Sequence, residues 1–470
     1  MAKPQPFAPH AYAVSLSTTD TTSEDKILWN WKGTHWENAS EDDAERDAYK
    51  WLEKNSFEHT TAANAKSAVS AAKLHLPKTP SKDSPNVIIP CLNEYVHVFD
   101  DRIEQHPHDR TEGIKHLISC DYDPSNNLTP LFTNLLNTSL PSLAIRSRVQ
   151  EYIGYTLIKD ARFQRAQIWK GSGANGKGVL ANVVQALHHK TTAIDPADLK
   201  GFKLSSMIGA SLMYVDECPQ RGIQEQTLKS LIAGEAVLID RKYKDPITTK
   251  ILGKWVILAN HMPATTDQSE GFWRRFDIIP FDHTVSENKR IANLADQIIN
   301  TELSGVLNWA LEGLMRLLKR GHFEIELPPE MVEAKSKAKQ ETNSMEAWFV
   351  EEDISVGSAA TTSKTRVYEH YSSWCKRSGM IALASPKFWG RMKQDKKGIL
   401  NLRDRKNGGY LCNIILNTPA ADWVEEKKQA SLPTIEDASE MLTTSPRKVA
   451  LTINMMLAEA ASEERSGMMH

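Results

Sequence analysis

Cysteine is scarce in this sequence of 470 residues, which contains five. They are Cys91, Cys120, Cys218, Cys375 and Cys412. Their number is odd and no pair has the spacing of a metal ligand, so the sequence argues against a disulfide framework and against a zinc ribbon. The N-terminal segment also lacks the basic start and apolar run of a signal peptide. We therefore expect a protein of a reducing compartment, with a cytoplasmic location.

Long apolar runs and an excess of one charge are missing as well. No apolar stretch reaches the roughly 18 residues of a membrane-spanning helix, so we expect no membrane partner. The composition is 40% hydrophobic and 25% charged, which excludes wholesale disorder. Lys and Arg number 57 against 59 Asp and Glu, for a formal net charge of -2. Because the whole chain is no polycation, any surface for nucleic acid must be local.

The length predicts a multidomain protein of two to four domains. Residues 1–25 are rich in Ser, Thr and Pro and are interpreted as a flexible arm. Residues 26–160 mix strand and helix patterns, which predicts an N-terminal α+β region. At its start, ILWNWKGTHWE predicts a small hairpin, and EDDAERDAYKWLEK, which begins acidic and ends basic, predicts a helix. We assign 161–345 to a central α/β domain and 346–425 to a C-terminal domain, and leave 426–470 as an unassigned tail.

Short apolar runs alternate with helical patterns between about residues 165 and 285. The runs AQIWKG, SLMYVDE, KWVILAN and FDIIPF are interpreted as strands, and KGVLANVVQALHH and QEQTLKSLIAG as helices. This alternation is typical of a parallel sheet covered by helices on both faces. The sequence therefore predicts an α/β fold for the central domain.

A glycine-rich segment connects the first of these strands to a helix. It consists of Gly171, Ser172, Gly173, Ala174, Asn175, Gly176, Lys177 and Gly178. Small residues let successive backbone N–H groups turn toward phosphate oxygens at a helix N-terminus, where Lys177 can reach the β- and γ-phosphates. The Ser or Thr that normally follows the lysine and binds Mg²⁺ is replaced by Gly178. The alternative is an ordinary glycine-rich turn with an exposed lysine.

Two later strands end in polar residues. The strand SLMYVDE ends in Asp216 and Glu217. In a phosphate-loop ATPase, Asp216 would hold Mg²⁺ while Glu217 orients and deprotonates the attacking water. The strand KWVILAN ends in Asn260, which we interpret as a sensor of the γ-phosphate or of that water. Taken singly, an acidic strand end that meets solvent and a turn-forming asparagine are the simpler interpretations.

Arg274 and Arg275 precede the last apolar strand. A guanidinium is suited to stabilising the charge on a transferring phosphoryl group, so one of the two is a candidate arginine finger. A neighbouring subunit would have to supply it, which requires a ring. The other arginine is expected to form structural salt bridges.

The order of these motifs resembles that of superfamily 3 helicases, specifically the helicase portion of phage and plasmid replication proteins and their poxvirus-type relatives. The resemblance covers roughly residues 26–425. It implies an AAA+-like P-loop ATPase core that uses ATP and Mg²⁺. It also implies a hexameric ring that encircles one DNA strand, moves 3′ to 5′ on it and uses an arginine finger across subunits.

The segment between the acidic pair and Asn260 predicts a helix followed by two strands around a charged turn. In the resembled family, the matching hairpin projects basic residues into the central channel. The candidates for DNA binding in this sequence are Lys229, Arg241, Lys242 and Lys244. The alternative is a solvated charged hairpin.

A helix, a second helix and two strands around a Gly-rich turn follow from about residue 350, an order that suggests a winged helix. Twelve basic and three acidic residues lie between Lys364 and Lys406, for a local charge of +9. We interpret this excess as a surface that binds DNA phosphates, while protein interaction or a solubilising face is the alternative.

These features together predict an ATP-dependent DNA helicase for replication of a phage, plasmid or integrated mobile element. Its partners would be single-stranded and forked DNA, other copies of the chain in a hexamer, and a separate primase or origin-binding protein. An ATP-gated DNA-binding initiator without processive unwinding is the competing prediction, and Gly178 favours it. A motor acting on another polymer, or in phage defence, is a third.

Overall fold

The computed structural model of the chain divides into two compact units, which are described separately. The first consists of residues 1–347 and 372–383, and the second of the remaining residues. The structure describes residues 6–82, 86–218, 222–241, 244–263, 265, 267–359, 361–396, 398–403 and 409–416. The predicted tail at 426–470 lies outside these residues. In the described part of the chain, no helix is both long and apolar enough to cross a bilayer.

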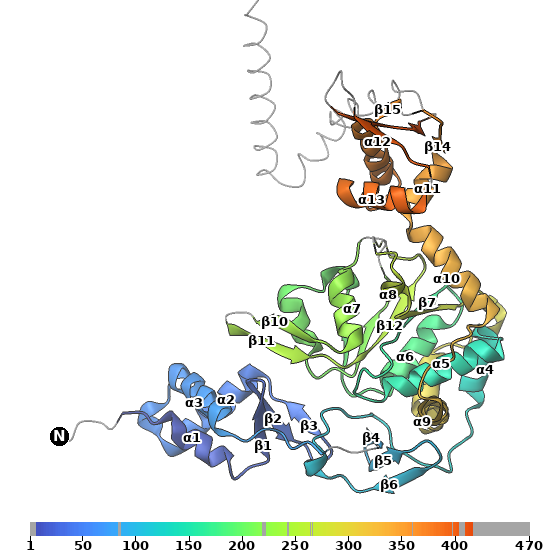
Figure 1. The fold of residues 1–470 in the computed structure, drawn as a ribbon. Coiled ribbons are helices and arrows are strands. Elements are labelled where there is room, and N and C mark those ends of the chain that lie inside the picture. The colour runs from blue at the N-terminus through green and yellow to red at the C-terminus, as the bar shows by residue number, and fades with distance from the viewer. Residues whose placement is uncertain are drawn as a thin grey trace, which may run out of the picture. The chain divides into compact units, whose positions relative to one another are not determined.

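The first unit begins with a small α+β module (Figure 1). Its elements are α1 (Pro9–Leu16), β1 (Thr21–Glu24), β2 (Ile27–Trp31), β3 (Trp36–Asn38), α2 (Glu41–Asn55) and α3 (Ala62–His75). The three strands form an antiparallel sheet in the order β1-β2-β3. Helix α2 has an acidic first turn and a basic last turn, and Ser40 caps it by accepting a hydrogen bond from the Asp43 N–H at 3.1 Å. The hairpin and helix predicted from the sequence are confirmed here.

The prediction of a flexible arm over residues 1–25 is wrong for residues 9–24. Helix α1 packs on α3, burying Tyr12 and Ala13 among the alanines of α2 and α3. Strand β1 pairs with β2 over its whole length. These elements have no amphipathic period of their own, because burial against a neighbour and pairing with a strand stabilise them.

A second antiparallel sheet follows and leads into the helices of the central domain. Its strands are β4 (Val87–Pro90), β5 (Tyr95–Val98) and β6 (Ile103–His106), in that order. The next helices are α4 (Pro130–Ser139) and α5 (Leu143–Thr156).

The centre of the first unit is a five-stranded parallel sheet. Its strands are β7 (Ala166–Lys170), β8 (Thr191–Ala193), β9 (Leu212–Val215), β12 (Lys254–Ala259) and β13 (Phe276–Pro280). Their order across the sheet is β13-β7-β12-β9-β8. Strand β12 therefore lies between β7 and β9, although both precede it in the sequence. The predicted α/β fold is confirmed, and because the strands are parallel, all their carboxyl ends meet at one edge.

Helices and one hairpin complete the first unit. The helices are α6 (Lys177–Ala186), α7 (Glu225–Ala233), α8 (Glu270–Trp273), α9 (Leu294–Arg320) and α10 (Pro329–Thr342). Between α7 and β12, strands β10 (Ala236–Arg241) and β11 (Lys244–Lys250) pair antiparallel. The helix and two strands that the sequence predicts here are therefore present.

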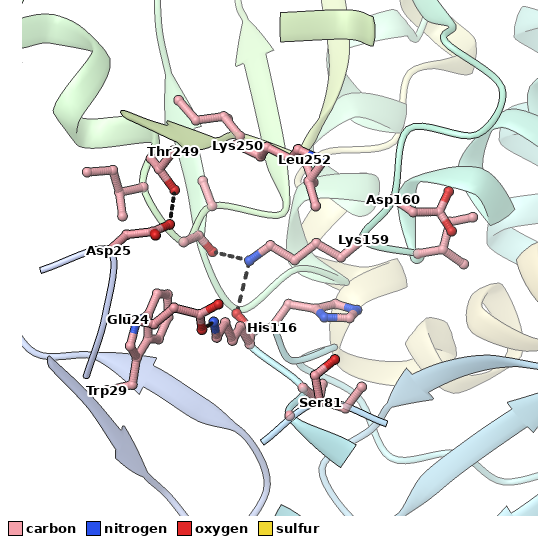
Figure 2. Close-up of a pocket in the computed structure, with 18 of the residues that line it drawn as sticks. Glu24, Asp25, Trp29, Ser81, His116, Lys159, Asp160, Thr249, Lys250 and Leu252 are labelled. Atoms are coloured by element: carbon pink, nitrogen blue, oxygen red, sulfur yellow. Dashed lines mark hydrogen bonds and ion pairs between the residues drawn. The ribbon is translucent and has the colours of Figure 1, made fainter. Parts of the chain in front are cut away.

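The N-terminal module and the central domain meet at a pocket of about 670 Å³ (Figure 2). Lys159 lies in its wall and donates hydrogen bonds to the Lys115 carbonyl at 3.0 Å and the Gly209 carbonyl at 3.2 Å. Thr249 of β11 donates to Asp25 of the module at 3.0 Å. Burial, and then the charge of Lys115, lowers the pKa of Lys159 to about 7. This pocket joins the two parts, and none of its lining residues belongs to the glycine-rich loop.

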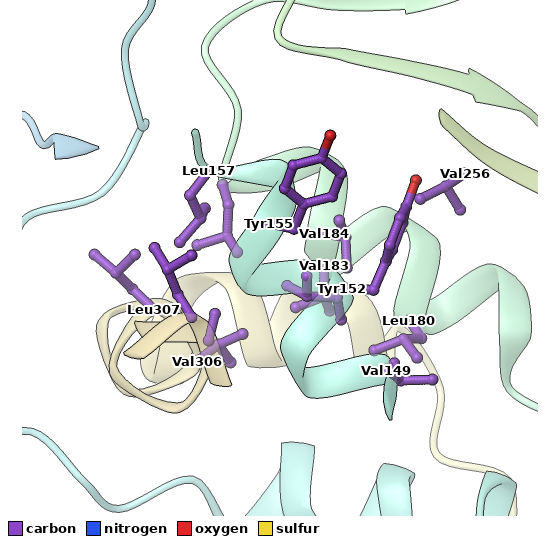
Figure 3. Close-up of a cluster of buried hydrophobic side chains, with 14 of the residues drawn as sticks. Val149, Tyr152, Tyr155, Leu157, Leu180, Val183, Val184, Val256, Val306 and Leu307 are labelled. Atoms are coloured by element: carbon purple, nitrogen blue, oxygen red, sulfur yellow. The ribbon is translucent and has the colours of Figure 1, made fainter. Parts of the chain in front are cut away.

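Helices α5, α6 and α9 share one hydrophobic core against the sheet (Figure 3). Helices α5 and α9 approach closely, since a Cβ at Gly154 would lie 2.5 Å from the Ala310 carbonyl oxygen. Tyr152 donates from the same helix to the Trp255 carbonyl of β12 at 2.5 Å. The predicted boundary at residue 160 is therefore no break in packing, because α5 is buried with the helices and sheet that follow it.

The second unit contains short sheets and helices around an aromatic core. It contains parts of two helices, α11 (Ser344–Glu351) and α12 (Lys364–Arg377). Its other elements are β14 (Ser355–Val356), β15 (Thr362–Ser363), α13 (Ser385–Asp395), β16 (Asn401–Arg403), β17 (Tyr410–Cys412) and β18 (Ile414–Ile415). Strands β15, β17 and β16 form one sheet, and β14 pairs with β18. Tyr371 and Phe388 stack at 4.5 Å between ring centroids, and Trp348 contacts both. Two helices precede the β16–β17 pair, the order that the sequence predicts.

Candidate active site at the carboxyl edge of the sheet

The glycine-rich segment forms the turn between β7 and α6, and its backbone conformation explains its composition. Gly173 and Gly176 have φ angles of +103° and +80°, and Ala174 has a φ of +51°. Side chains other than glycine rarely adopt these conformations. Three residues of the turn, Gly173, Ala174 and Gly176, therefore have positive φ angles, and the turn ends where α6 begins at Lys177.

Close contacts with residues that follow β13 and end α4 fix the position of this turn. Asn175 is buried and donates from Nδ2 to the Phe281 carbonyl oxygen at 2.7 Å, just past the end of β13. A Cβ at Gly171 would lie 2.1 Å from Asn175 Nδ2, and one at Gly176 would lie 2.1 Å from Ser139 Oγ. Glycine is therefore required at both positions for steric reasons, while space remains open around Gly173.

Lys177 begins α6 and reaches across the sheet edge. Its Nζ donates to the Gly171 carbonyl at 2.8 Å and to Asn260 Oδ1 at 2.9 Å. Partial burial lowers the pKa of Lys177, and the nearby Glu217 carboxylate opposes that shift. The ammonium group thus lies beside the glycine-rich turn and donates to two neutral oxygen atoms.

The acidic pair and Asn260 lie at the same edge. Asp216 and Glu217 follow β9 directly and are exposed, and Asn260 follows β12. Asn260 Nδ2 donates to Glu217 Oε1 at 3.2 Å. Asn260 therefore links the lysine to the glutamate, because one side-chain amide bonds both. The structure brings these three predicted residues together through the insertion of β12 between β7 and β9.

The donor set at this edge fits a hard divalent cation in part. Gly178 supplies no hydroxyl group, so that protein ligand is missing. The Asp216 carboxylate is exposed, and no ion pair engages it among the described residues. Mg²⁺ is commonly held by one or two carboxylates together with substrate phosphates and water. Asp216 suits that coordination without a hydroxyl from the helix.

The two arginines differ in their surroundings. Arg275 is half-buried and donates to the Gly271 carbonyl, and burial, with the charge of Arg274, lowers its pKa. Arg274 is exposed, and no salt bridge occupies its guanidinium in the described part of the chain. Arg275 therefore has a structural role within α8 and its turn, whereas Arg274 extends into solvent.

The basic residues predicted to bind DNA are partly engaged by carboxylates. Lys229 Nζ lies 2.7 Å from Asp267 Oδ2. Arg241 Nη1 lies 3.3 Å from Glu41 Oε1, which belongs to the N-terminal module. Lys242 lies outside the described residues, and Lys244 begins β11.

A carboxylate that joins two strand ends beside the glycine-rich turn was not predicted from the sequence. Lys170, the last residue of β7, pairs with Glu341 of α10. The other oxygen of Glu341 accepts the Met262 N–H at 2.8 Å, two residues after Asn260. One carboxylate on α10 thus fixes the ends of β7 and β12. No local pattern could reveal it, because Glu341 is 171 residues from Lys170.

Comparisons with known proteins match parts of this chain. Residues 169–275 match the sequence model of a family of unknown function, DUF5906. That interval contains the glycine-rich turn, the acidic pair and Asn260. A protein of Acanthamoeba polyphaga mimivirus named "Putative helicase L207/L206" is 30% identical over 124 residues, which are 24% of this chain and 13% of that protein. The match therefore spans about an eighth of the length of the mimivirus protein.

Solved structures of the NrS-1 C-terminal region are also similar. The A form of the apo structure has a TM-score of 0.46 at 12% identity and covers 88% of this chain and 100% of that chain. Another apo structure, of residues 305–718 of that protein, has a TM-score of 0.44 with the same identity and coverage. These scores lie below 0.5, so by themselves they do not establish a common fold.

Proposed function

We propose that this protein is an ATP-dependent DNA helicase that serves replication of a phage, plasmid or integrated mobile element. The observation that carries the proposal is the hydrogen-bonded series from Lys177 through Asn260 to Glu217. A cation at the start of α6, with an amide and a carboxylate that follow two neighbouring strands, lies beside a glycine-rich turn. These are the parts that phosphoryl transfer to water requires. The partial match to a mimivirus protein named as a helicase supports DNA unwinding as the work performed.

Each residue then has a definite task. The N–H groups of the turn and the N-terminus of α6 bind the triphosphate. Lys177 exchanges its bonds to Gly171 and Asn260 for phosphate oxygens, which offer it stronger, charge-assisted bonds. Asn260 keeps Glu217 oriented, and Glu217 accepts the proton of the attacking water.

Asp216 is the residue that would hold Mg²⁺ on the bound nucleotide. The ion supplies neutralisation of phosphate charge when it is present. The exposure of Asp216 at the sheet edge supports this role, because a carboxylate there can reach the metal directly or through water.

Arg274 is the better candidate for the finger. It is exposed, while Arg275 is bonded to the carbonyl of Gly271. An exposed guanidinium can enter the site of a neighbouring copy and stabilise charge on the transferred phosphoryl group. This proposal requires a ring of subunits, and a hexamer moving 3′ to 5′ is the form that we propose.

Single-stranded DNA would contact the β10–β11 hairpin. Lys229 and Arg241 are already paired with acids, so they contribute only if those pairs open. Lys242 and Lys244 are the remaining candidates. The basic stretch from Lys364 to Lys406, with its net charge of +9, is proposed as a winged helix that binds the duplex ahead of the fork.

The second candidate function is an ATP-gated initiator that assembles on DNA without translocating. Two observations favour it. Gly178 removes a metal-ligating hydroxyl group, which would slow turnover. The ion pairs of Lys229 and Arg241 also reduce the cationic surface of the hairpin.

Strand displacement on forked DNA with a 3′ or a 5′ loading tail, measured with ATP and Mg²⁺, separates these functions. We expect displacement from the 3′ tail only, and none with Lys177→Ala or Glu217→Gln. Loss of Lys177 should lower ATP turnover at least about 100-fold, the scale on which a transition-state contact matters. Lys319→Ala, an exposed lysine of α9, is the matched control and should behave as wild type.

The remaining outcomes decide between the proposals. Turnover and DNA binding without displacement would favour the initiator. Unchanged ATP turnover in Lys177→Ala or in Glu217→Gln would remove the ATPase assignment altogether.

A further inference from the structure

A second group of chemically active side chains lies away from the sheet edge. It consists of His35, Glu37 and His189, whose ligand-capable atoms all lie within 4.8 Å of one another. His189 Nε2 is 3.5 Å from Glu37 Oε1, and the two imidazole rings are 5.4 Å apart between centroids. None of these residues belongs to a motif that the sequence reveals.

The fold brings the cluster together from two distant segments. His35 directly precedes β3 and Glu37 lies within it, so the two share one face of the strand. His189 follows α6, and its N–H donates to the Leu117 carbonyl at 3.1 Å. The backbone of β3 is held by a hydrogen bond from the Trp36 N–H to the Ile114 carbonyl at 2.7 Å. Both segments are therefore fixed before any ligand binds.

His35 is prepared to act as a ligand. Its Nδ1 is 2.9 Å from Thr34 Oγ1, and Tyr95 donates to the Thr34 carbonyl at 2.8 Å. When Nδ1 donates to the hydroxyl group, the lone pair of Nε2 remains available, which is the arrangement of metal-binding histidines.

We propose that His35, Glu37 and His189 bind a divalent transition-metal ion of the zinc class. Two imidazoles and one carboxylate are a ligand set that zinc accepts, whereas Mg²⁺ and Ca²⁺ prefer oxygen atoms alone. Ligands about 2.1 Å from zinc in a tetrahedron lie roughly 3.4 Å from each other. The separation of 3.5 Å between His189 and Glu37 already matches this spacing.

The exposure of the cluster leaves room for adjustment and for a fourth ligand. The side chains of His189 and Glu37 are 44% and 38% exposed, so they can rotate to close the remaining gaps. Water or an exchangeable ligand completes the tetrahedron, as at zinc sites with an open position. Lys32 lies 3.8 Å from the other oxygen of Glu37 and weakens the attraction for a cation. We therefore expect reversible binding.

Metal binding would connect the N-terminal module to the segment that follows α6. Glu37 belongs to the module, while His189 lies three residues beyond the end of α6, the helix that begins at Lys177. The ion would thus restrict movement between them. This inference does not depend on the proposed helicase activity.

The test is zinc binding by the chelator-treated full-length protein without nucleotide, measured by calorimetry and by metal analysis after dialysis. After dialysis, we expect wild type to retain one zinc ion more per chain than His189→Ala. Calorimetry should show at least a tenfold weaker affinity for this ion in the variant. Zinc should also raise the melting temperature of wild type by roughly 2 °C or more. His322→Ala, an exposed histidine elsewhere, should match wild type.

Glu37→Gln keeps the size of the side chain and provides a second variant should His189→Ala fold poorly. It should also lose the additional zinc ion. Equal zinc stoichiometry and affinity in wild type and in the folded variants would overturn the proposal. The cluster would then be a histidine–carboxylate contact, and any bound zinc would lie elsewhere, for example at Asp216.

Discussion

Replacing Gly176 by alanine tests the geometry of the glycine-rich turn. Gly176 has a φ of +80°, where an alanine costs about 1–2 kcal/mol. The new Cβ would also lie 2.1 Å from Ser139 Oγ and 3.0 Å from Leu135 Cδ1. Overpacking of this kind costs about 1–3 kcal/mol. We therefore expect Gly176→Ala to lower the free energy of unfolding by about 2–5 kcal/mol.

The steric part of this cost can be separated from the backbone part. Ser139 Oγ is buried and has no hydrogen-bond partner among the described residues. Ser139→Ala alone should therefore be neutral or slightly stabilising. Added to Gly176→Ala, it should recover most of the steric cost of about 1–3 kcal/mol, because the 2.1 Å contact disappears and the remaining atoms are Leu135 Cδ1 at 3.0 Å and the Cβ of residue 139 at 3.2 Å. The backbone cost should remain.

Urea unfolding of the nucleotide-free protein, followed by circular dichroism, provides the measurement. Gly178→Ala is the matched control, since nothing lies within 4 Å of its Cβ and its φ is not in the left-handed region. It should stabilise α6 by about 0.5–1 kcal/mol. The ATP turnover that we propose should fall about 100-fold in Gly176→Ala, because a shift of about 1 Å in a group that positions a substrate can have that effect. Equal stability of the two alanine variants, or no recovery with Ser139→Ala, would refute the reasoning.

Two further predictions concern the core. Arg148 bonds Asp277 through Nε at 2.7 Å and Nη2 at 3.0 Å, with both side chains buried. Arg148→Met should destabilise the protein by about 3–5 kcal/mol, because it leaves the Asp277 charge buried without its partner. The double variant with Asp277→Leu should lose much less, and midpoints of urea unfolding measure both. Equal losses in the single and double variants would contradict the role of the pair. Lys254 is buried, and burial lowers its pKa to about 7, below its unfolded value near 10.5. The unfolded state therefore binds more protons, so stability should rise between pH 7 and pH 10 by at most about 1.4 kcal/mol per pH unit for this lysine. In Lys254→Met the slope should be smaller, and an unchanged slope would exclude Lys254 as its source.

Much of the fold could be predicted from the sequence because its signals are local. Alternating apolar runs revealed β7, β9, β12 and β13 of the parallel sheet, whereas the short strand β8 was not predicted. An acidic first turn and a basic last turn revealed α2. Local patterns failed where neighbours stabilise an element. Helix α1 was missed because contacts with α3 stabilise it, and α5 was assigned to the wrong side of a boundary because its burial partners follow it in the chain.

The candidate site divides in the same way. The sequence by itself determined that Glu217 and Asn260 follow strands and that the glycine-rich segment can turn around a phosphate. These features depend on residue type and on the φ angles that glycine can adopt, which are properties of a few neighbouring positions. Only the tertiary structure decided that β12 lies between β7 and β9, so that Asn260 bonds both Lys177 and Glu217. It also brought His189 to His35. Strand order and such contacts depend on how distant apolar faces are buried together, and local periodicity carries no information about that choice.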